Sequence, residues 1–246
     1  MQIEETARAQ FRLDTNCSLE CEENYRVMIN KRRFHEGARI FEGVSEDFKA
    51  IIFKGDAYIM ASDELYEWTV ETYEKYKPEW FCEFDNLRRL DNKLAEHGLK
   101  IFDTHVFFLP DEYFVEDEMI CPYEVRWYNR DTIDEIRDKK RFPHALPGSA
   151  TQPDVIAAAA FDGNRPVAVA GASEDGRYMW QIGIDVDPEY EHHGLAIYLV
   201  TALKNKILDK GYLPYYGTSE SHSISQDVAV RSGFIPAWAE VISKKI

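Results

Sequence analysis

The stretch Gly183-Ile-Asp-Val-Asp-Pro-Glu-Tyr-Glu-His-His-Gly194-Leu-Ala196 combines the end of a strand, a tight turn and the start of a helix. Its apolar run stops before Pro188, and an amphipathic helix is predicted over residues 195–210. The first N–H groups of such a helix lack partners within it and lie at the positive end of its dipole. Gly194 lets an anion approach the main chain closely, and Ala196 keeps the first turn narrow. The stretch therefore predicts a loop that binds a phosphate group.

Composition describes a folded protein with one large domain or two small ones. The chain has 246 residues, of which 45% are hydrophobic and 13% aromatic, enough for a sizeable core. Its net charge of −15 argues against a nucleic-acid binder, because such proteins usually carry a basic surface. The acidic excess is concentrated in residues 1–118, whereas residues 119–246, which contain the phosphate loop, are nearly balanced.

The sequence contains no sign of a membrane segment or a metal site. No apolar run approaches the roughly 18 residues that a membrane span needs, and the acidic N-terminus lacks the apolar core of a signal peptide. We therefore expect a soluble, cytoplasmic protein. Cys17 and Cys21 are spaced C-x3-C, but no second pair and no nearby histidine accompany them, so no metal is expected.

The first half of the chain predicts a smaller α/β domain. Helices are expected over residues 3–13, 63–76 and 86–97, and strands over 49–53, 57–61 and 101–109. The acidic run at residues 111–118 is a natural boundary, which gives domains of 1–118 and 119–246.

The second half is richer in signals. Strands are expected over residues 123–128, 155–161, 166–172, 178–186, 213–218 and 234–242, and helices over 132–140, 195–210 and 225–232. The second and third of these strands form a hairpin around Asp162-Gly163-Asn164. This order predicts an α/β (α+β) fold, a mixed sheet with helices on both faces. The loop at 141–153 is expected to lie over a site.

Two motifs in this order resemble the GCN5-related N-acetyltransferase (GNAT) superfamily, over about residues 123–246. Val186 to Ala196 is similar to the family segment V-x-P-x-Y-[RQ]-x-x-G-x-[GA]. Ser225 to Phe234 is similar to the family ending S-x-x-x-x-x-K/R-x-G-F. The resemblance implies a mixed central sheet of GNAT type and transfer of an acetyl group from acetyl-CoA to an amine.

The resemblance also implies where acetyl-CoA binds. Its pantetheine arm would pair with main-chain groups near Ile184 and Val186, like an added strand. Its pyrophosphate would lie on the N–H groups of the following turn, and Ser225 would reach the pantetheine or its phosphate. The implied cofactor-binding residues are Ile184, Val186, Glu191, His192, His193, Gly194, Leu195, Ala196 and Ser225. A backbone N–H near Val186 would stabilise the oxyanion.

The chain departs from the family at three positions. Glu191 replaces the usual Arg or Gln, and we expect its side chain to point to solvent while its backbone contributes. Trp180 stands where the histone-acetylating branch has a glutamate base, and Ala229 stands where many relatives have a tyrosine acid. Neither familiar catalytic residue can therefore be assigned.

Substitutes for these groups are expected near the end of the strand after the long helix. Glu220 or His222 is a candidate base, and Tyr216, or its neighbour Tyr215, a candidate acid. Structural roles for the tyrosines and a plain polar loop at 219–223 remain the alternative.

The function of the first half stays open at this point. Its helix-then-strand ending, residues 86–109, allows an interpretation as a degenerate acetyltransferase-like half without a phosphate loop. The leading hypothesis for the chain is an acetyl-CoA-dependent N-acetyltransferase acting on a primary amine. The main alternative is a CoA-binding regulatory or sensor module without turnover, and a protein that no longer binds CoA is a third.

Overall fold

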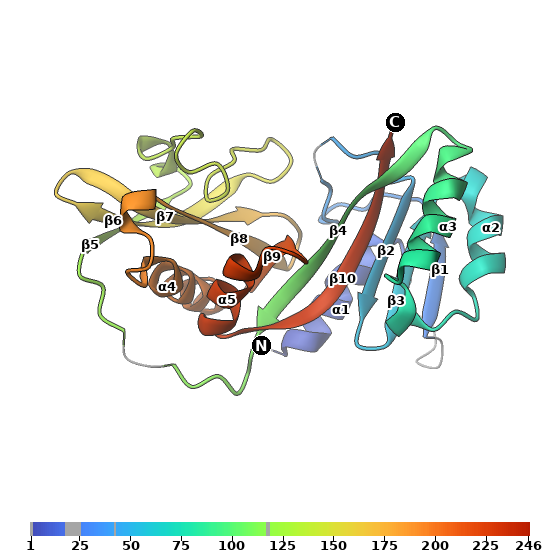
Figure 1. Cartoon of the computed structure of the whole chain (residues 1–246), viewed down its shortest axis with the longest axis horizontal. Helices are drawn as coiled ribbons and strands as arrows, with labels where there is room; N and C mark the ends of the chain where they lie inside the picture. Colours follow the sequence, from blue (N-terminus) through green and yellow to red (C-terminus); the bar gives the residue numbers. More distant parts are fainter. Residues whose placement is uncertain (1, 18–25, 42, 117–118) are drawn as a thin grey trace.

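The computed structural model describes residues 2–17, 26–41, 43–116 and 119–246, and the strands of this part form one sheet (Figure 1). They are β1 (Val27–Lys31), β2 (Phe48–Phe53), β3 (Asp56–Ala61), β4 (Leu99–Pro110), β5 (Glu124–Asn129), β6 (Asp154–Asp162), β7 (Arg165–Glu174), β8 (Met179–Val186), β9 (Leu213–Ser219) and β10 (Phe234–Lys245). Their order across the sheet is β1-β3-β2-β10-β4-β9-β8-β7-β6-β5. The predicted mixed α/β architecture is confirmed.

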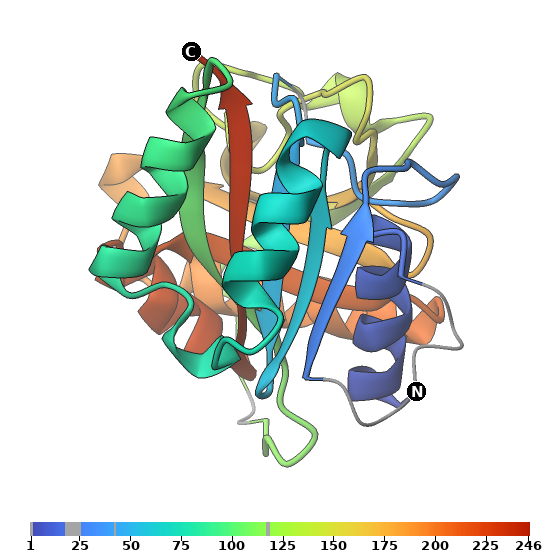
Figure 2. The ribbon, with the colours of Figure 1, turned by 90° about the vertical axis from the view of Figure 1, so that its right-hand side faces the viewer.

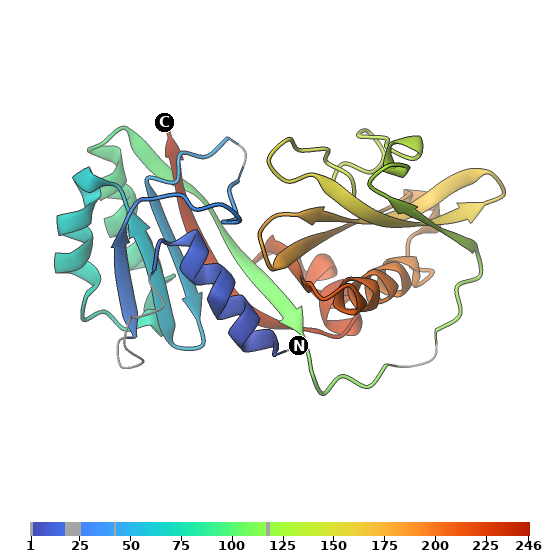
Figure 3. The same ribbon diagram turned by 180° about the vertical axis from the view of Figure 1, so that it is seen from behind.

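The strand β6 shows how the C-terminal part of the sheet packs on both faces. Ala158 and Ala160 belong to the cluster formed with α4 (Leu195–Asp209). Ala157 and Ala159 belong to the cluster on the other face. Successive strand residues point to opposite faces, so this run of small side chains lets both layers approach the sheet closely. In Figure 3, α4 and the shorter α5 (Ser223–Arg231) lie below these strands, and the segment 130–153 lies above them.

The predicted helix over residues 132–140 is wrong. Only a short 3-10 turn, η2 (Ile133–Glu135), forms there. The Oδ1 atom of Asp138 accepts hydrogen bonds from the N–H groups of Lys140 and Arg141, at 3.1 and 3.3 Å. A side chain that bonds nearby backbone groups in this way competes with the helical pattern.

The strand β4 comes from the first half of the chain yet lies between β9 and β10. Residues 105–108 pair with β9, and the full length of β4 pairs with β10. The sheet is therefore continuous across the predicted boundary after residue 118, although residues 117–118 themselves lie outside the described part. The division into domains 1–118 and 119–246 stays a prediction.

Three helices cover the N-terminal part of the sheet on two faces. Phe11 of α1 (Ile3–Asp14) packs in the cluster with Phe53 of β2. The other two helices, α2 (Asp63–Tyr73) and α3 (Phe84–Ala95), pack on the opposite face and stand in front of the strands in Figure 2. The parallel edge strand β1 was not predicted from the sequence. Among the described helices, none is both long and apolar enough to cross a membrane.

A buried ionic cluster ties the first half of the chain to β10. The Nε atom of the buried Arg39 lies 2.6 Å from Oδ2 of Asp14, and its Nη2 atom lies 3.0 Å from Oε2 of Glu240. Burial alone would raise the pKa of Glu240, but Arg39 and the neighbouring Lys49 hold it below its usual value. Removing one member of such a buried pair typically costs about 3–5 kcal/mol, so the cluster fixes the loop that contains Arg39 onto the sheet.

Candidate active site

The strands β8 and β9 run side by side and then separate. Their parallel ladder ends where Ile182 lies opposite Tyr216. Beyond this point β9 pairs with β4, while β8 continues to pair only with β7 among the described strands. Among the described strands, the edge of residues 183–186 that faces away from β7 therefore has no strand partner. We call the gap between this edge and β9 the opening. The predicted cofactor-binding residues Ile184 and Val186 belong to this free section.

The turn that follows β8 presents N–H groups to solvent. His192 has a φ of +63° and Gly194 a φ of +78°, and alternating left-handed residues can turn neighbouring N–H groups toward one side. Gly194 is the N-cap of α4, and a Cβ built on it meets no atom within 4 Å. Within the described residues, no acceptor is found for the N–H groups of residues 193–196. The Glu191 side chain is exposed beside them.

Tyr216 and Ser225 are brought together at the opening. The Tyr216 hydroxyl lies 2.8 Å from Oγ of Ser225, which belongs to the first turn of α5. Burial raises the pKa of Tyr216 above its ordinary value, although the bond to Ser225 acts in the opposite direction. The phenol therefore keeps its proton at neutral pH.

The other two predicted catalytic residues lie in the turn between β9 and α5. Both side chains are exposed, and Nδ1 of His222 lies 3.4 Å from Oγ1 of Thr218. The backbone carbonyl of Glu220 accepts a hydrogen bond from Nε2 of Gln226 at 2.9 Å. In the described part of the chain, no contact joins Glu220 or His222 to Tyr216 or Ser225, and their catalytic roles stay predictions.

A loop crosses the opposite face of the sheet at two glycines. Gly171 of β7 and Gly183 of β8 are direct cross-strand partners. A Cβ on Gly183 would lie 2.0 Å from the carbonyl oxygen of His144, and a Cβ on Gly171 equally close to that of Ala145. Glycine inside a strand often marks such a close approach of another backbone. The two glycines therefore set where the loop passes.

Asp185, on the same face as Gly183, binds this loop with both carboxylate oxygens. Its Oδ2 atom accepts the N–H groups of His144 at 2.8 Å and of Ala145 at 2.7 Å. Its Oδ1 atom lies 2.7 Å from Nδ1 of His144. A carboxylate within an apolar strand is costly unless it is bonded, and these contacts account for Asp185. The His144 side chain is 79% exposed, so its ring is open to a dissolved molecule.

A cavity of about 100 Å³ lies next to His144, between the loop and the sheet. Ser173 and Gln181 line it together with the two glycines. Behind them, Oγ of Ser173 donates to Asp175 at 2.6 Å, while the Tyr215 hydroxyl donates to Asp175 and contacts Oε1 of Gln181 at 3.2 Å. Burial raises the pKa of Asp175 to about 6. The cavity thus borders a group of polar side chains that are hydrogen-bonded to Asp175 or to one another.

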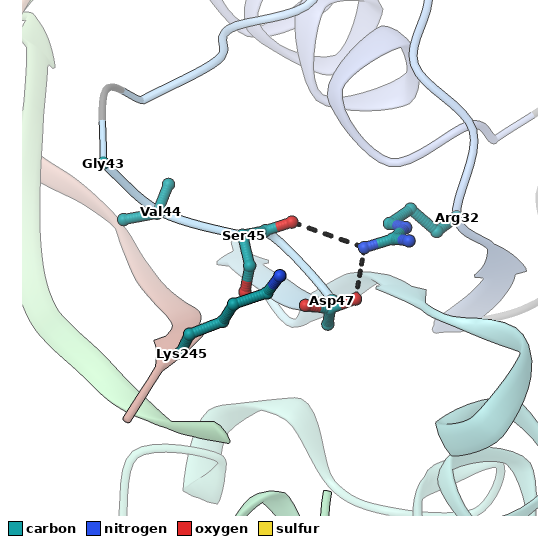
Figure 4. Close-up of a pocket in the computed structure, with 6 residues that line it drawn as sticks. All are labelled: Arg32, Gly43, Val44, Ser45, Asp47 and Lys245. Carbon is teal, nitrogen blue, oxygen red and sulfur yellow. Dashed lines mark hydrogen bonds and ion pairs between the residues drawn. The ribbon is translucent and has the colours of Figure 1, made fainter. Parts of the chain in front are cut away.

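A larger hollow of about 430 Å³ lies elsewhere, between the loop before β2 and the end of β10 (Figure 4). Arg32 enters it but is bound to the carboxylate of Asp47 and to the backbone carbonyl of Ser45 at 3.4 Å. Lys245 points toward Ser45 from the other side (Figure 4). None of the predicted site residues lines this hollow.

Comparison with known proteins identifies the family. A model of the acetyltransferase (GNAT) family matches residues 110–234, slightly more than half of the chain. This chain belongs to the acetyltransferase (GNAT) family. The predicted N-acetyltransferase enzyme is therefore confirmed at the level of the family. A search among curated proteins finds no match.

Solved GNAT structures resemble the chain at low identity. A GCN5-related N-acetyltransferase-like protein from Streptococcus suis is 12% identical with a TM-score of 0.48, over 98% of this chain and all of that one. An enzyme of this family from Kribbella flavida is 15% identical with a TM-score of 0.46, over 63% of each chain. A GNAT acetyltransferase from Novosphingobium aromaticivorans is 14% identical with a TM-score of 0.44, over 61% of this chain and 68% of that one.

The two positions that depart from the GNAT catalytic pattern are structural. Trp180 is buried and stacks on Tyr212 with ring centroids 4.1 Å apart, and Ala229 is fully buried in the core. The contact between His144 and Asp185 was not predicted from the sequence. Its signals are Asp185 and Gly183, because a carboxylate and a glycine within an apolar strand both indicate that something packs against it. Cys21 lies outside the described residues.

Proposed function

We propose that this GNAT family member transfers an acetyl group from acetyl-CoA to a primary amine. The turn of residues 191–196 carries the proposal, because its free N–H groups at the start of α4 suit a pyrophosphate. The free side of β8 at Ile184 and Val186 offers main-chain groups to the amides of pantetheine. Ser225, whose Oγ atom lies 2.8 Å from the Tyr216 hydroxyl, is the proposed side-chain contact for the coenzyme arm.

The proposed chemistry is attack of the neutral amine on the thioester carbonyl. A backbone N–H near Val186 would stabilise the oxyanion that forms. Tyr216, which keeps its proton, would protonate the departing CoA thiolate. Glu220 and His222, in the turn that follows β9, are the candidates for the base, acting through water. The cytoplasm as the place of this reaction remains part of the proposal.

A pair of glycine variants at opposite ends of α4 tests the binding of acetyl-CoA. Gly194 and Gly211 both have positive φ, +78° and +85°, and at both a Cβ meets open space. Replacement by alanine strains each backbone to a similar degree. Calorimetry should show that Gly194→Ala weakens acetyl-CoA binding by about tenfold, whereas Gly211→Ala leaves the Kd unchanged. Loss of affinity in both or in neither would contradict the proposed phosphate site.

Turnover separates the enzyme from a sensor module. Release of free CoA is measured with a panel that contains a polyamine, an arylalkylamine, an amino sugar and a short peptide with a free N-terminus. Acetyl-CoA should raise the melting temperature, because a ligand of the native state stabilises it, and at least one amine should release CoA. Tight binding without release from any amine would favour the sensor, and no binding would refute both.

A further inference from the structure

We propose that His144 is the general base for the acceptor amine and that Asp185 is the positioning residue that holds its ring. This inference rests on the proposed acetyl transfer and names the group that takes the amine proton. It differs from the assignment of Glu220 or His222, which came from their place in the chain.

The position of His144 follows from the glycine contact. Its carbonyl oxygen lies over Gly183, which is the first residue of the free section of β8. The acetyl group is expected along this section. Tyr216 belongs to the core cluster on the α4 face, whereas His144 lies on the opposite face. An acid for the departing sulfur and a base for the incoming nitrogen would thus stand on opposite sides of the reacting carbon.

The orientation of the ring also suits a base. The 2.7 Å contact between Nδ1 of His144 and Oδ1 of Asp185 favours the tautomer with its proton on Nδ1, which leaves Nε2 as the acceptor. The two backbone N–H groups that bind Oδ2 prevent this carboxylate from turning away. A carboxylate that orients an imidazole in this manner is a recurring device for general-base catalysis.

The charges around the pair leave Asp185 as the carboxylate that faces the ring. Asp187, two residues further along the chain, forms ion pairs with Arg141 and Arg165. Its Oδ2 atom lies 2.8 Å from Nη2 of Arg165. The neighbouring cavity of about 100 Å³ has room for about three water molecules, or for the narrow end of an unbranched amine.

Acetyl transfer to an ammonium acceptor releases one proton in all. Nε2 of His144 takes one proton from the ammonium form of the acceptor and passes it to solvent. The nitrogen pair forms the C–N bond while the carbonyl π pair moves to oxygen, and that pair returns as the C–S bond breaks with its electrons on sulfur. Nitrogen loses a second proton to water, and sulfur takes one from Tyr216, which solvent reprotonates. The net products are amide, CoA thiol and one proton.

The test compares His144→Gln and Asp185→Asn with His97→Gln, an exposed histidine at the end of α3. We expect His144→Gln to lower kcat by about 10²-fold or more, to remove the acid limb of the pH–rate profile, and to leave the Kd of acetyl-CoA unchanged. Asp185→Asn should lower kcat less, and 15N NMR of its His144 ring should show a mixture of tautomers in place of one. His97→Gln should match the wild type in every measurement.

The outcomes distinguish this inference from the proposed function. If the wild type releases CoA and His144→Gln does so at the same rate and with the same pH profile, the base is not His144 although the enzyme assignment stands. If no amine of the panel reacts, the hydrolysis of acetyl-CoA is measured, since water then replaces the amine and needs the same base. Absence of both reactions in the wild type would overturn the function and this inference together.

Discussion

Gly171 and Gly183 face each other across β7 and β8, and each lies directly beneath a carbonyl oxygen of the loop that contains His144. The space that two side chains would fill is taken by the backbone of another segment. This contact sets how closely the loop packs on the sheet. Asp185 then holds the loop in place by accepting hydrogen bonds from its backbone N–H groups. The loop and the opening between β8 and β9 therefore form one unit.

Gly183→Ala should destabilise the protein and slow the reaction, because the new Cβ would lie 2.0 Å from the carbonyl oxygen of His144. Overpacking of this kind typically costs about 1–3 kcal/mol, or about 2–4 °C in Tm for each kcal/mol in a chain of this size. Differential scanning calorimetry and kcat are the measurements. Gly163→Ala, at a turn where a Cβ meets open space, should keep kcat. An unchanged Tm and kcat in Gly183→Ala would show that the loop is not held there.

Tyr216→Phe should lower kcat by about 10- to 100-fold with little effect on the KM for acetyl-CoA, because only the proton donor is lost. The ring contacts with Phe108 and Phe234 do not need the hydroxyl, so Tm should change little. Ser225→Ala removes the partner of the hydroxyl at 2.8 Å and should have a smaller effect on kcat. Wild-type kcat in Tyr216→Phe would exclude the phenol as the acid.

The strand, turn and helix from Gly183 to Ala196 could be predicted because every signal is local. Pro188 ends the strand, Gly194 permits the left-handed N-cap, and the apolar spacing of α4 follows directly. The exposed Glu191 also agrees with the expectation that its side chain points to solvent. The structure of such a segment is determined by residues that lie close to one another in the sequence.

Other features depend on contacts between distant segments, which no local pattern encodes. The place of β4 between β9 and β10 joins residues more than a hundred positions apart in the sequence. The helix expected over residues 132–140 failed because Asp138 bonds its own backbone neighbours. The role inferred for His144 depends on a loop crossing the sheet, which only Gly183 and Asp185 indirectly indicate.

Asp175 should make stability depend on pH in a defined direction. Burial raises its pKa to about 6, above the value of 3.8 expected when unfolded, while Arg39 opposes and Asp14 adds to the shift. A raised folded pKa gives a stabilising contribution that is complete below about pH 4 and is lost as the pH rises through 6. The stability of Asp175→Asn relative to the wild type should therefore improve by about 2 kcal/mol between pH 4 and 7. Urea unfolding measures it, and a difference independent of pH would contradict the shift.

Glu191→Gln should tighten the binding of CoA, because an exposed carboxylate beside the turn repels the pyrophosphate. We expect an effect of about two- to fivefold at low salt that shrinks as salt is added, since exposed charges are screened. Calorimetry at two salt concentrations measures it. Asp209→Asn, in the last turn of the same helix, is the matched control and should bind CoA as the wild type does. Weaker binding by Glu191→Gln would mean that this side chain takes part in holding the coenzyme.

The most direct test of the account is an NMR titration of the 15N-labelled protein with acetyl-CoA. The amide signals of His193, Gly194, Leu195 and Ala196 should shift as the coenzyme saturates, and those of Lys210 and Gly211 at the other end of α4 should stay in place. If the four turn signals remained unmoved at saturation, the pyrophosphate would not bind at this turn, and the proposed acetyl transfer at the opening between β8 and β9 would be contradicted.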